Sequence, residues 1–339
     1  MGMGAACIAL VTQPTRLDGL IERWSTKSAA KFRFGRFRDQ ERELRLGTLA
    51  ATSTEVESAD AEADFRRYEY EDEGYRELVK RLREELAFEY PVVVVEKQHL
   101  PNFMFLRALA VVVLGQDGLV ANTAKYAAEL PIIGVNPDPQ RNDGVLLPFA
   151  PSMARLAVRN ALEKKLKTRR VTLAEVRLND GQQMLAFNDF FIGRAGHASA
   201  RYTLRCGAEA EPQSSSGILV STGAGSTGWM SSVFNMTAAI ACKHGTQLPQ
   251  PQPINWEERR LDWVVREPFI SKHSSANLVC GTLQERDELV VESLMPERGV
   301  IFSDGIEEDF LEFNSGTIAR ICVAHHRARL GLPEPTWRA

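Results

Sequence analysis

Four continuous apolar runs in the first half of the chain predict the strands of a parallel sheet. The runs are Cys7–Val11, Val92–Val95, Ala108–Leu114 and Pro131–Val135. Apolar runs without alternating polar positions are typical of strands that helices cover on both faces. Between the first two runs, Tyr75–Phe88 carries leucines at four-residue spacing, which predicts an amphipathic helix.

The residues after the third run predict a βαβ unit with a loop where the strand meets the helix. Gly115-Gln-Asp-Gly118 ends the strand, Leu119–Leu130 has a helical pattern, and Pro131–Val135 supplies the next strand. Ligands of parallel α/β sheets bind at the carboxyl ends of the strands, so this loop is a candidate binding loop. Residues 22–75 are rich in charge instead, and Ala51–Asp64 predicts a surface insertion.

From about residue 149 the pattern changes to one helix and many short strands. Met153–Lys167 predicts the helix, Arg201–Arg205 and Glu288–Glu292 are two of the strand-like pieces, and Gly245–Pro253 is a Pro/Gln-rich loop. The predicted fold is α/β, with a Rossmann-like parallel-sheet domain at 1–148 and a β-rich, sandwich-like domain at 149–312. Residues 313–339 are expected to pack back on the N-terminal domain. A length of 339 residues agrees with about two domains.

Composition narrows the class of function. Forty-one basic and forty-four acidic residues leave a net charge of −3, which argues against a protein that mainly coats nucleic acid or anionic membrane. The five cysteines are widely spaced without a C-x-x-C pair, and the histidines lack metal-ligand spacing, so neither disulfides nor a zinc site are expected. No apolar stretch approaches about 18 residues and the N-terminus lacks a signal-peptide pattern, which favours a cytoplasmic protein.

One glycine-rich loop matches the dinucleotide fingerprint G-x-G-x-x-G. Gly223-Ala-Gly225-Ser-Thr-Gly228 follows the strand-like Gly217–Ser221 and precedes the helix-like Trp229–Ala241. The fingerprint requires an acidic residue about 20 positions later, which holds a ribose hydroxyl. No Asp or Glu lies between Trp229 and Trp256, so a Rossmann dehydrogenase is disfavoured. The loop could still receive an anion at the helix N-terminus, or serve packing alone.

Five short motifs, in this order, resemble those of the NAD kinase family. They are Gly115-Gln-Asp-Gly118, Gly134-Val-Asn136, the pair Asn188-Asp189 within Phe187–Ile192, Ser221–Trp229 and Ser303-Asp-Gly305. The family's counterparts are GGDG, GVN, an NE pair, TPTGSTAY and a late DG. The chain is most similar to the mitochondrial type of NAD kinase, through Gly134–Gly144, Ser214–Trp229, Val265–Phe269 and Phe310–Ile321. The resemblance covers about residues 105–323, with a weaker one at Leu10–Leu20.

The resemblance implies the NAD kinase fold and the family's reaction. In that reaction the γ-phosphoryl group of ATP, which carries Mg²⁺, is transferred to the 2′-hydroxyl of the adenosine ribose of NAD to give NADP. Asp117 matches the family's catalytic aspartate, and a carboxylate in a glycine-flanked turn suits a general base. Standing alone, it would be read as a helix-capping aspartate. The resemblance also implies a homo-oligomer.

The resemblance further assigns a set of ligand-binding residues. They are Gly115, Gly118, Asn136, Asn188, Asp189, Ser216, Thr222, Ser226, Thr227, Gly228, Trp229 and Ser232. Glycines would let backbone approach phosphates, and an amide beside a carboxylate suits ribose hydroxyls and a base edge. Plainer alternatives stay open: an Asx turn at Asn188-Asp189, a core tryptophan at Trp229, and a hairpin turn at Asp304-Gly305.

Three departures from the family's motifs leave other functions open. Gln116 replaces the second glycine of GGDG, Gly223-Ala224 replaces a Pro-Thr pair, and Pro137-Asp-Pro-Gln140 follows GVN. A side chain at position 116 lies where backbone would otherwise meet a triphosphate. The alternatives are a phosphoryl donor other than ATP, a catalytically weakened relative that binds NAD or NADP as a sensor, and a kinase of the same fold that acts on a sugar or polyol hydroxyl.

Overall fold

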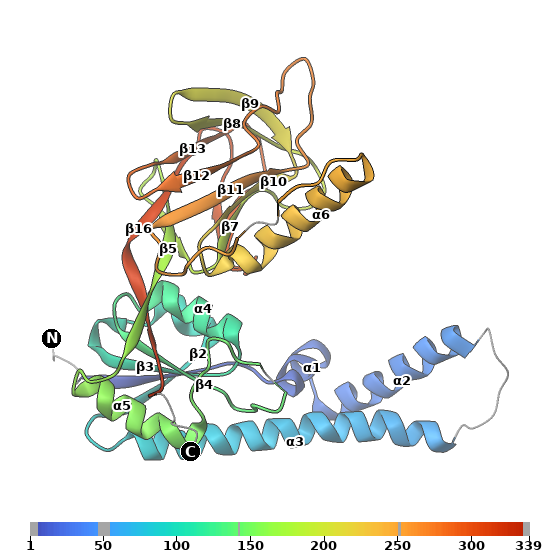
Figure 1. Cartoon of the computed structure of the whole chain (residues 1–339). Coiled ribbons are helices and arrows are strands. Elements are labelled where there is room, and N and C mark those ends of the chain that lie inside the picture. Colours follow the sequence, from blue (N-terminus) through green and yellow to red (C-terminus); the bar gives the residue numbers. More distant parts are fainter. Residues whose placement is uncertain (1–5, 47–54, 142, 250–251, 335–339) are drawn as a thin grey trace.

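The structure, a computed structural model, describes residues 6–46, 55–141, 143–249 and 252–334, with side chains described outside 37–64. Figure 1 shows a lower lobe built on a parallel sheet and an upper lobe built mainly of antiparallel strands. Two long strands, β5 (Thr168–Leu178) and β16 (Ile318–Gly331), run between the lobes. The mixed α/β class predicted from the sequence is confirmed.

The lower lobe contains the four predicted parallel strands. They are β1 (Cys7–Thr12), β2 (Val92–Glu96), β3 (Ala108–Leu114) and β4 (Pro131–Val135), in the spatial order β2-β1-β3-β4. The prediction that helices cover both faces of each strand is wrong for β2, where Val93 and Val94 are 38% and 37% exposed. The reason is position, because β2 is the edge strand of this sheet.

Helices cover both faces of the parallel sheet. These helices are α3 (Glu55–Leu86), α4 (Asp117–Tyr126) and α5 (Ala154–Leu162), whereas α1 (Arg16–Trp24) and α2 (Lys27–Leu46) pack with α3 in a separate apolar cluster. On one face, α3 and α5 bury apolar side chains against β1, β3 and β4, and Leu78, Leu82 and Leu86 of α3 belong to that core. Leu119 and Val120 of α4 pack against the other face.

The predicted helix Tyr75–Phe88 is the end of a longer element. Helix α3 has 32 residues, and its first part lies beside α2, so that the two helices extend past the sheet (Figure 1). Of the expected insertion Ala51–Asp64, residues 51–54 lie outside the described residues and the remainder belongs to α3. The described residues also form the short 3₁₀ helices η1 (Lys97–Asn102), η2 (Phe105–Arg107), η3 (Pro151–Met153) and η4 (Gly225–Thr227).

The upper lobe is a sandwich of two sheets. One layer continues from the parallel sheet through β5, β16, β6 (Gln183–Ala186), β8 (Ala200–Cys206), β9 (Glu209–Ser215) and β13 (Leu289–Ser293). The other is antiparallel, in the order β12 (Cys280–Gln284), β11 (Arg260–Arg266), β10 (Gly217–Ser221), β7 (Asp189–Arg194), β14 (Gly299–Ser303) and β15 (Phe310–Glu312). Their core contains the fully buried Phe190, Tyr202 and Phe313.

Strand β10, which precedes the glycine-rich loop, pairs antiparallel with both β7 and β11. Helix α6 (Trp229–Lys243) follows the loop and packs through Met230 against Leu219 and Val264 of this sheet. A dinucleotide fingerprint acts within a parallel βαβ unit. The antiparallel pairing therefore agrees with setting the dehydrogenase reading aside.

Strand β16 joins the two lobes through its own backbone. Its Arg329 and Leu330 pair in parallel with Pro131 and Ile132 of β4, whereas Leu289–Glu292 of β13 pairs with its beginning. The register shifts between Val323 and Arg327, where the strand passes from one lobe to the other. One chain segment thus belongs to both cores.

The structure also describes the cysteines, the apolar character of the helices and the grouping of metal-ligating side chains. All five cysteines are free. Among the described residues, no helix is long and apolar enough to cross a membrane, and no three His, Cys, Asp or Glu side chains gather as a metal site.

The α3–sheet contact makes a stability prediction. Leu82 is fully buried between α3 and the sheet, so Leu82→Ala is expected to lower the free energy of unfolding by about 2–5 kcal/mol. The exposed Leu156 of α5 provides the matched control, where the same change is expected to cost less than about 0.5 kcal/mol. Urea denaturation followed by circular dichroism measures both. Equal losses would contradict this packing.

Candidate functional site

The strand order creates a crevice between β1 and β3. From β1 the chain continues to β2 on one side, and from β3 to β4 on the other, which is the arrangement that binds ligands at strand ends. Tyr75 of α3 reaches this point, where its hydroxyl donates to the Leu114 carbonyl oxygen at 2.8 Å and accepts the Gln13 N–H at 3.1 Å. Burial raises the pKa of Tyr75 to about 12, so the hydroxyl stays protonated.

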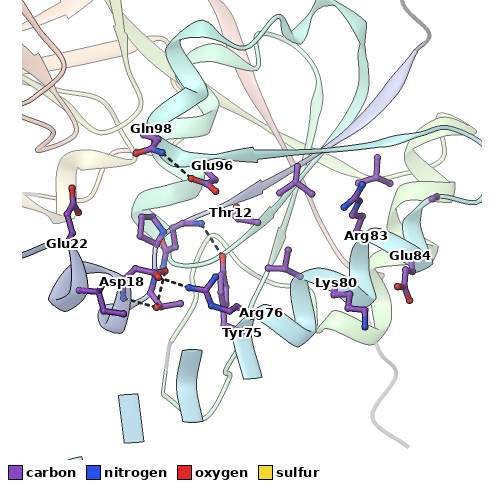
Figure 2. A pocket seen from close by; sticks show the side chains of 18 of the residues that line it. Thr12, Asp18, Glu22, Tyr75, Arg76, Lys80, Arg83, Glu84, Glu96 and Gln98 are labelled. Carbon is purple, nitrogen blue, oxygen red and sulfur yellow. Dashed lines mark hydrogen bonds and ion pairs between the residues drawn. The ribbon is translucent and has the colours of Figure 1, made fainter. Parts of the chain in front are cut away.

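Two open cavities lie at this edge of the sheet. The smaller, of about 920 Å³, is lined by residues that include Gln13, Arg16, Lys97 and Gln116, and it adjoins the predicted binding loop. The larger, of about 1210 Å³, lies between α1, α3 and β2 (Figure 2) and is lined by no residue of the predicted binding loop, whereas Gln116 of that loop lines the smaller cavity. We therefore take the smaller cavity as the part of the surface that belongs to the candidate site.

Asp117 is the first residue of α4 and is held by backbone. Its Oδ1 accepts the Leu146 N–H at 2.8 Å and its Oδ2 accepts the Val145 N–H at 3.2 Å. The segment that carries these N–H groups lies against β4 so closely that a Cβ on Gly134 would be 2.0 Å from the Leu146 carbonyl oxygen. A carboxylate has about four acceptor positions, so the oriented side chain can accept further hydrogen bonds.

The other residues of the predicted loop after β3 lie around Asp117. Gly115 is buried beside the Gln13 side chain, whereas Gly118 is exposed. Gln116 is the exposed N-cap residue of α4, and its side chain makes no capping hydrogen bond. The N-terminus of α4 therefore opens toward the cavity with a side chain where the family has glycine.

Residues 187–189, which we call the Asn188-Asp189 turn, connect β6 to β7, whose first residue is Asp189, and they are fixed through their backbone. The Asp304 carboxylate accepts the N–H of Phe187 at 3.1 Å, of Asn188 at 2.6 Å and of Asp189 at 3.4 Å. From the other side, Thr222 donates its hydroxyl to the Phe187 carbonyl oxygen at 2.6 Å and its N–H to the Asn188 carbonyl oxygen at 2.9 Å. The turn is thus held from two elements without using its own side chains.

The side chains of Asn188 and Asp189 have no hydrogen-bond partner among the described residues. Asp189 is nevertheless buried. Burial raises the pKa of Asp189 to about 7, and the nearby Asp304 carboxylate contributes to the rise. A carboxyl group with such a pKa is partly protonated at neutral pH and can donate as well as accept a hydrogen bond.

Asp304 itself is paired across the lobes. Lys125 of α4 donates to the Ser303 hydroxyl at 2.9 Å and lies 4.0 Å from Asp304 Oδ2, and the Lys125 and Asp304 side chains are each 2% exposed. Lys125 also lies 3.8 Å from Asp309, which accepts a hydrogen bond from Tyr126. Burial lowers the pKa of Lys125, while the two carboxylates oppose that change.

Two hydroxyl side chains of the glycine-rich loop donate hydrogen bonds within the protein, so their protons are not free to bind a ligand. Thr222 and Ser226 use their hydroxyls within the protein, and Ser226 Oγ donates to the Gly223 carbonyl oxygen at 2.8 Å. Thr227 and Gly228 are exposed. A Cβ on Gly225 would lie 2.2 Å from the Asn188 carbonyl oxygen, so glycine allows the loop to meet the Asn188-Asp189 turn.

Trp229 lies in an aromatic stack. Its ring is nearly parallel to that of Phe191, at 8° and 5.8 Å between centroids, and the Arg266 guanidinium carbon lies 5.0 Å from its centroid. Ser232, one turn further along α6, is exposed. Trp229 is half-buried, so it joins a cluster and still presents part of its surface.

Two predicted residues lie apart from these groups. Ser221 pairs with Asp189, whereas Ser216 precedes the opposite end of β10, about 16 Å away at roughly 3.3 Å per residue. The structure therefore does not bring Ser216 to the Asn188-Asp189 turn. Asn136 is buried after β4, where its Oδ1 accepts the Asp138 N–H at 3.0 Å and shapes the following loop.

The sequence left the role of Asp304 open and missed Lys125. Asp304 does lie in a turn, with φ values of 57° and 71° at Asp304 and Gly305, but its carboxylate points into the protein and binds the Asn188-Asp189 turn. The Ser303-Asp-Gly305 motif in the sequence indicated that position 304 could be functional. Lys125 had no motif, and its place in a helix pattern did not reveal a partner 179 positions away.

Comparisons with known proteins agree on the fold. No protein-family model matches the sequence, and no curated protein sequence matches it significantly. Among solved structures, an NAD kinase from Archaeoglobus fulgidus in complex with ATP is similar with a TM-score of 0.51 and 20% identity, over 76% of this chain and 90% of that one. Yeast NADH kinase complexed with NADH is similar with a TM-score of 0.53 and 12% identity, over 98% of this chain and 84% of the yeast chain. The chain therefore has the NAD kinase fold, as predicted.

The pKa of Asp189 makes a prediction about stability and pH. Because the folded protein raises this pKa to about 7, the neutral form is favoured and stability is lost as the pH rises through that value. Asp189→Asn mimics the neutral form, so its stability relative to the unaltered protein should increase by about 2–4 kcal/mol between pH 5 and pH 8. Urea denaturation at the two pH values measures the change.

The charged group that acts on Asp189 is Asp304, which is itself close to Lys125. The matched control is Asp180→Asn in the exposed β5–β6 turn, where hydrogen bonds from Gln182 lower the pKa of the carboxyl group. This control should show no such gain at pH 8. A pH-independent difference for Asp189→Asn would contradict the raised pKa.

Proposed function

We propose that the protein is an NAD kinase, which transfers the γ-phosphoryl group of ATP to the 2′-hydroxyl of the adenosine ribose of NAD and forms NADP. The observation that carries the proposal is the Asp117 carboxylate, which two backbone N–H groups orient at the carboxyl end of β3. The fold supports it, because a solved NAD kinase and a solved NADH kinase share this fold.

Phosphoryl transfer needs alignment, charge neutralisation and an acceptor for the proton of the attacking hydroxyl. Asp117 supplies the proton acceptor, since its carboxylate keeps free acceptor positions while Val145 and Leu146 fix its direction. The 2′-hydroxyl transfers its proton to Asp117 as its oxygen forms a bond to the γ-phosphorus, and the ADP oxygen leaves from the opposite side.

The phosphate chain of ATP would lie in the 920 Å³ cavity. Gln116, the N-cap residue of α4, lines this cavity, and the N–H groups at a helix N-terminus favour anions. Arg16 and Lys97 line the same cavity and neither forms an ion pair among the described residues. No group of three metal-ligating side chains exists in the described part of the chain, so in this proposal Mg²⁺ enters with ATP as part of the substrate.

The acceptor nucleotide would be held by the Asn188-Asp189 turn. The two side chains carry an amide and a carboxyl group with no partner among the described residues, which matches the paired hydroxyls of a ribose or the edge of a base. Partial protonation of Asp189 near neutral pH gives it both donor and acceptor capacity. Trp229, stacked on Phe191 beside the glycine-rich loop, supplies an aromatic surface next to this turn.

Removal of the proposed base is the test of the reaction. Purified protein with NAD, ATP and Mg²⁺ should form NADP, measured with an NADP-dependent dehydrogenase. Asp117→Asn should lower kcat by about 10²–10⁴-fold with little change in the KM for NAD, because only proton transfer is lost. Asp180→Asn, the same change on an exposed turn, should keep the activity.

No NADP above the Asp117→Asn background would exclude the proposal. Parallel assays with a panel of sugar and polyol acceptors in place of NAD would then show whether the protein phosphorylates another hydroxyl.

Gln116 favours a second candidate, a sensor that binds NAD or NADP without turnover. Its side chain is exposed at the helix N-terminus that the phosphates would meet. For a kinase, Gln116→Gly should lower the KM for ATP by about threefold or more, because the backbone becomes more accessible to phosphate. For a sensor, calorimetry should show NAD binding that neither ATP nor Gln116→Gly affects, with no NADP formed by either protein.

A further inference from the structure

The Asn188-Asp189 turn depends on a carboxylate that belongs to another segment. Asp304 accepts hydrogen bonds from three consecutive N–H groups of residues 187–189, while its own N–H donates to the Asp189 carbonyl oxygen at 3.0 Å. Such a set of converging donors fixes both the position and the direction of a backbone turn. The place of the Asn188 and Asp189 side chains therefore depends on Asp304 as well as on Thr222.

Asp304 in turn requires a counter-charge. A carboxylate that is 2% exposed has lost its hydration, which is unfavourable unless charges and donors replace water. Besides the three N–H groups, the cation close to it is Lys125, whose side chain is equally buried and is anchored on Ser303. Removal of Lys125 would leave the Asp304 carboxylate with the three N–H donors, and removal of Asp304 would leave Lys125 with Ser303 and Asp309.

Lys125 comes from the other lobe and from the helix that begins with the proposed base. Asp117 is the first residue of α4 and Lys125 is eight residues later, about 12 Å along the helix axis. Asp117, α4, Lys125, Asp304 and the Asn188-Asp189 turn thus form one continuous chain of covalent and polar contacts. It connects the group that would accept the proton with the groups that would hold the acceptor nucleotide.

We propose that Lys125 and Asp304 are a positioning pair that sets the Asn188-Asp189 turn at a fixed place relative to Asp117. The pair controls affinity for the acceptor nucleotide and leaves the proton transfer to Asp117. This inference rests on the proposed function for its kinetic consequences, but its structural part can be measured without turnover.

Amide hydrogen exchange tests the structural part on the full chain. Asp304→Asn keeps one acceptor oxygen and presents an NH₂ group to the N–H donors, so amides 187–189 should exchange about tenfold faster or more. Amides of β11 and β12 should be unchanged. Glu297→Gln, the same chemical change at an exposed ion pair with Arg194, is the matched control and should leave all these amides as they are.

A milder variant tests the same role in case Asp304→Asn prevents folding. Ser303→Ala removes the hydroxyl that accepts from Lys125 and leaves both charges in place. It should accelerate exchange at residues 187–189 in the same direction by a smaller factor. If amides 187–189 keep the rates of the unaltered protein in both variants, or if all amides of the upper lobe accelerate equally, the positioning role is excluded.

Kinetics distinguishes positioning from catalysis. Lys125→Met and Asp304→Asn should raise the KM for NAD by about tenfold or more and change kcat by less than about threefold, and Lys125→Arg should restore part of the affinity. A loss confined to kcat, as expected for Asp117→Asn, would overturn the inference. If the unaltered protein forms no NADP, the proposed function fails, whereas the exchange data and calorimetric NAD binding still decide the positioning role.

Discussion

The candidate site depends on one kind of interaction, a carboxylate that accepts hydrogen bonds from consecutive backbone N–H groups. Asp117 binds residues 145–146 in this way, and Asp304 binds residues 187–189. In each case a side chain from one element fixes a loop from another. This arrangement explains how loops far apart in sequence can hold reacting groups steadily while their own side chains remain available to a ligand.

The two lobes are linked by covalent geometry and by charge. Strand β16 pairs with β4 at one end and with β13 at the other, so displacement of one lobe would strain backbone hydrogen bonds of both. The Lys125–Asp304 pair adds a buried polar contact between the lobes. These two links hold Asp117 of the lower lobe and the Asn188-Asp189 turn of the upper lobe at a fixed relative position.

Much of the fold could be predicted because apolar patterns are local. The strands β1, β3 and β4 and the helices α4 and α6 were identified within a few residues, since burial of each element is visible in its own sequence. The coverage of β2 could not be predicted, because edge or centre depends on neighbours and not on the run of valines. The first part of α3 was not predicted because its segment is rich in charged residues.

The sequence by itself determined which short motifs end strands and begin helices, and so it marked Asp117, the Asn188-Asp189 pair and the late Asp304. Only the tertiary structure decided what these residues touch. It showed that Ser216 lies at the far end of β10, that Trp229 stacks on Phe191, and that Lys125 is the counter-ion of Asp304. The reason is physical: local patterns record whether a residue is buried, but the partner of a buried charge is chosen by long-range packing.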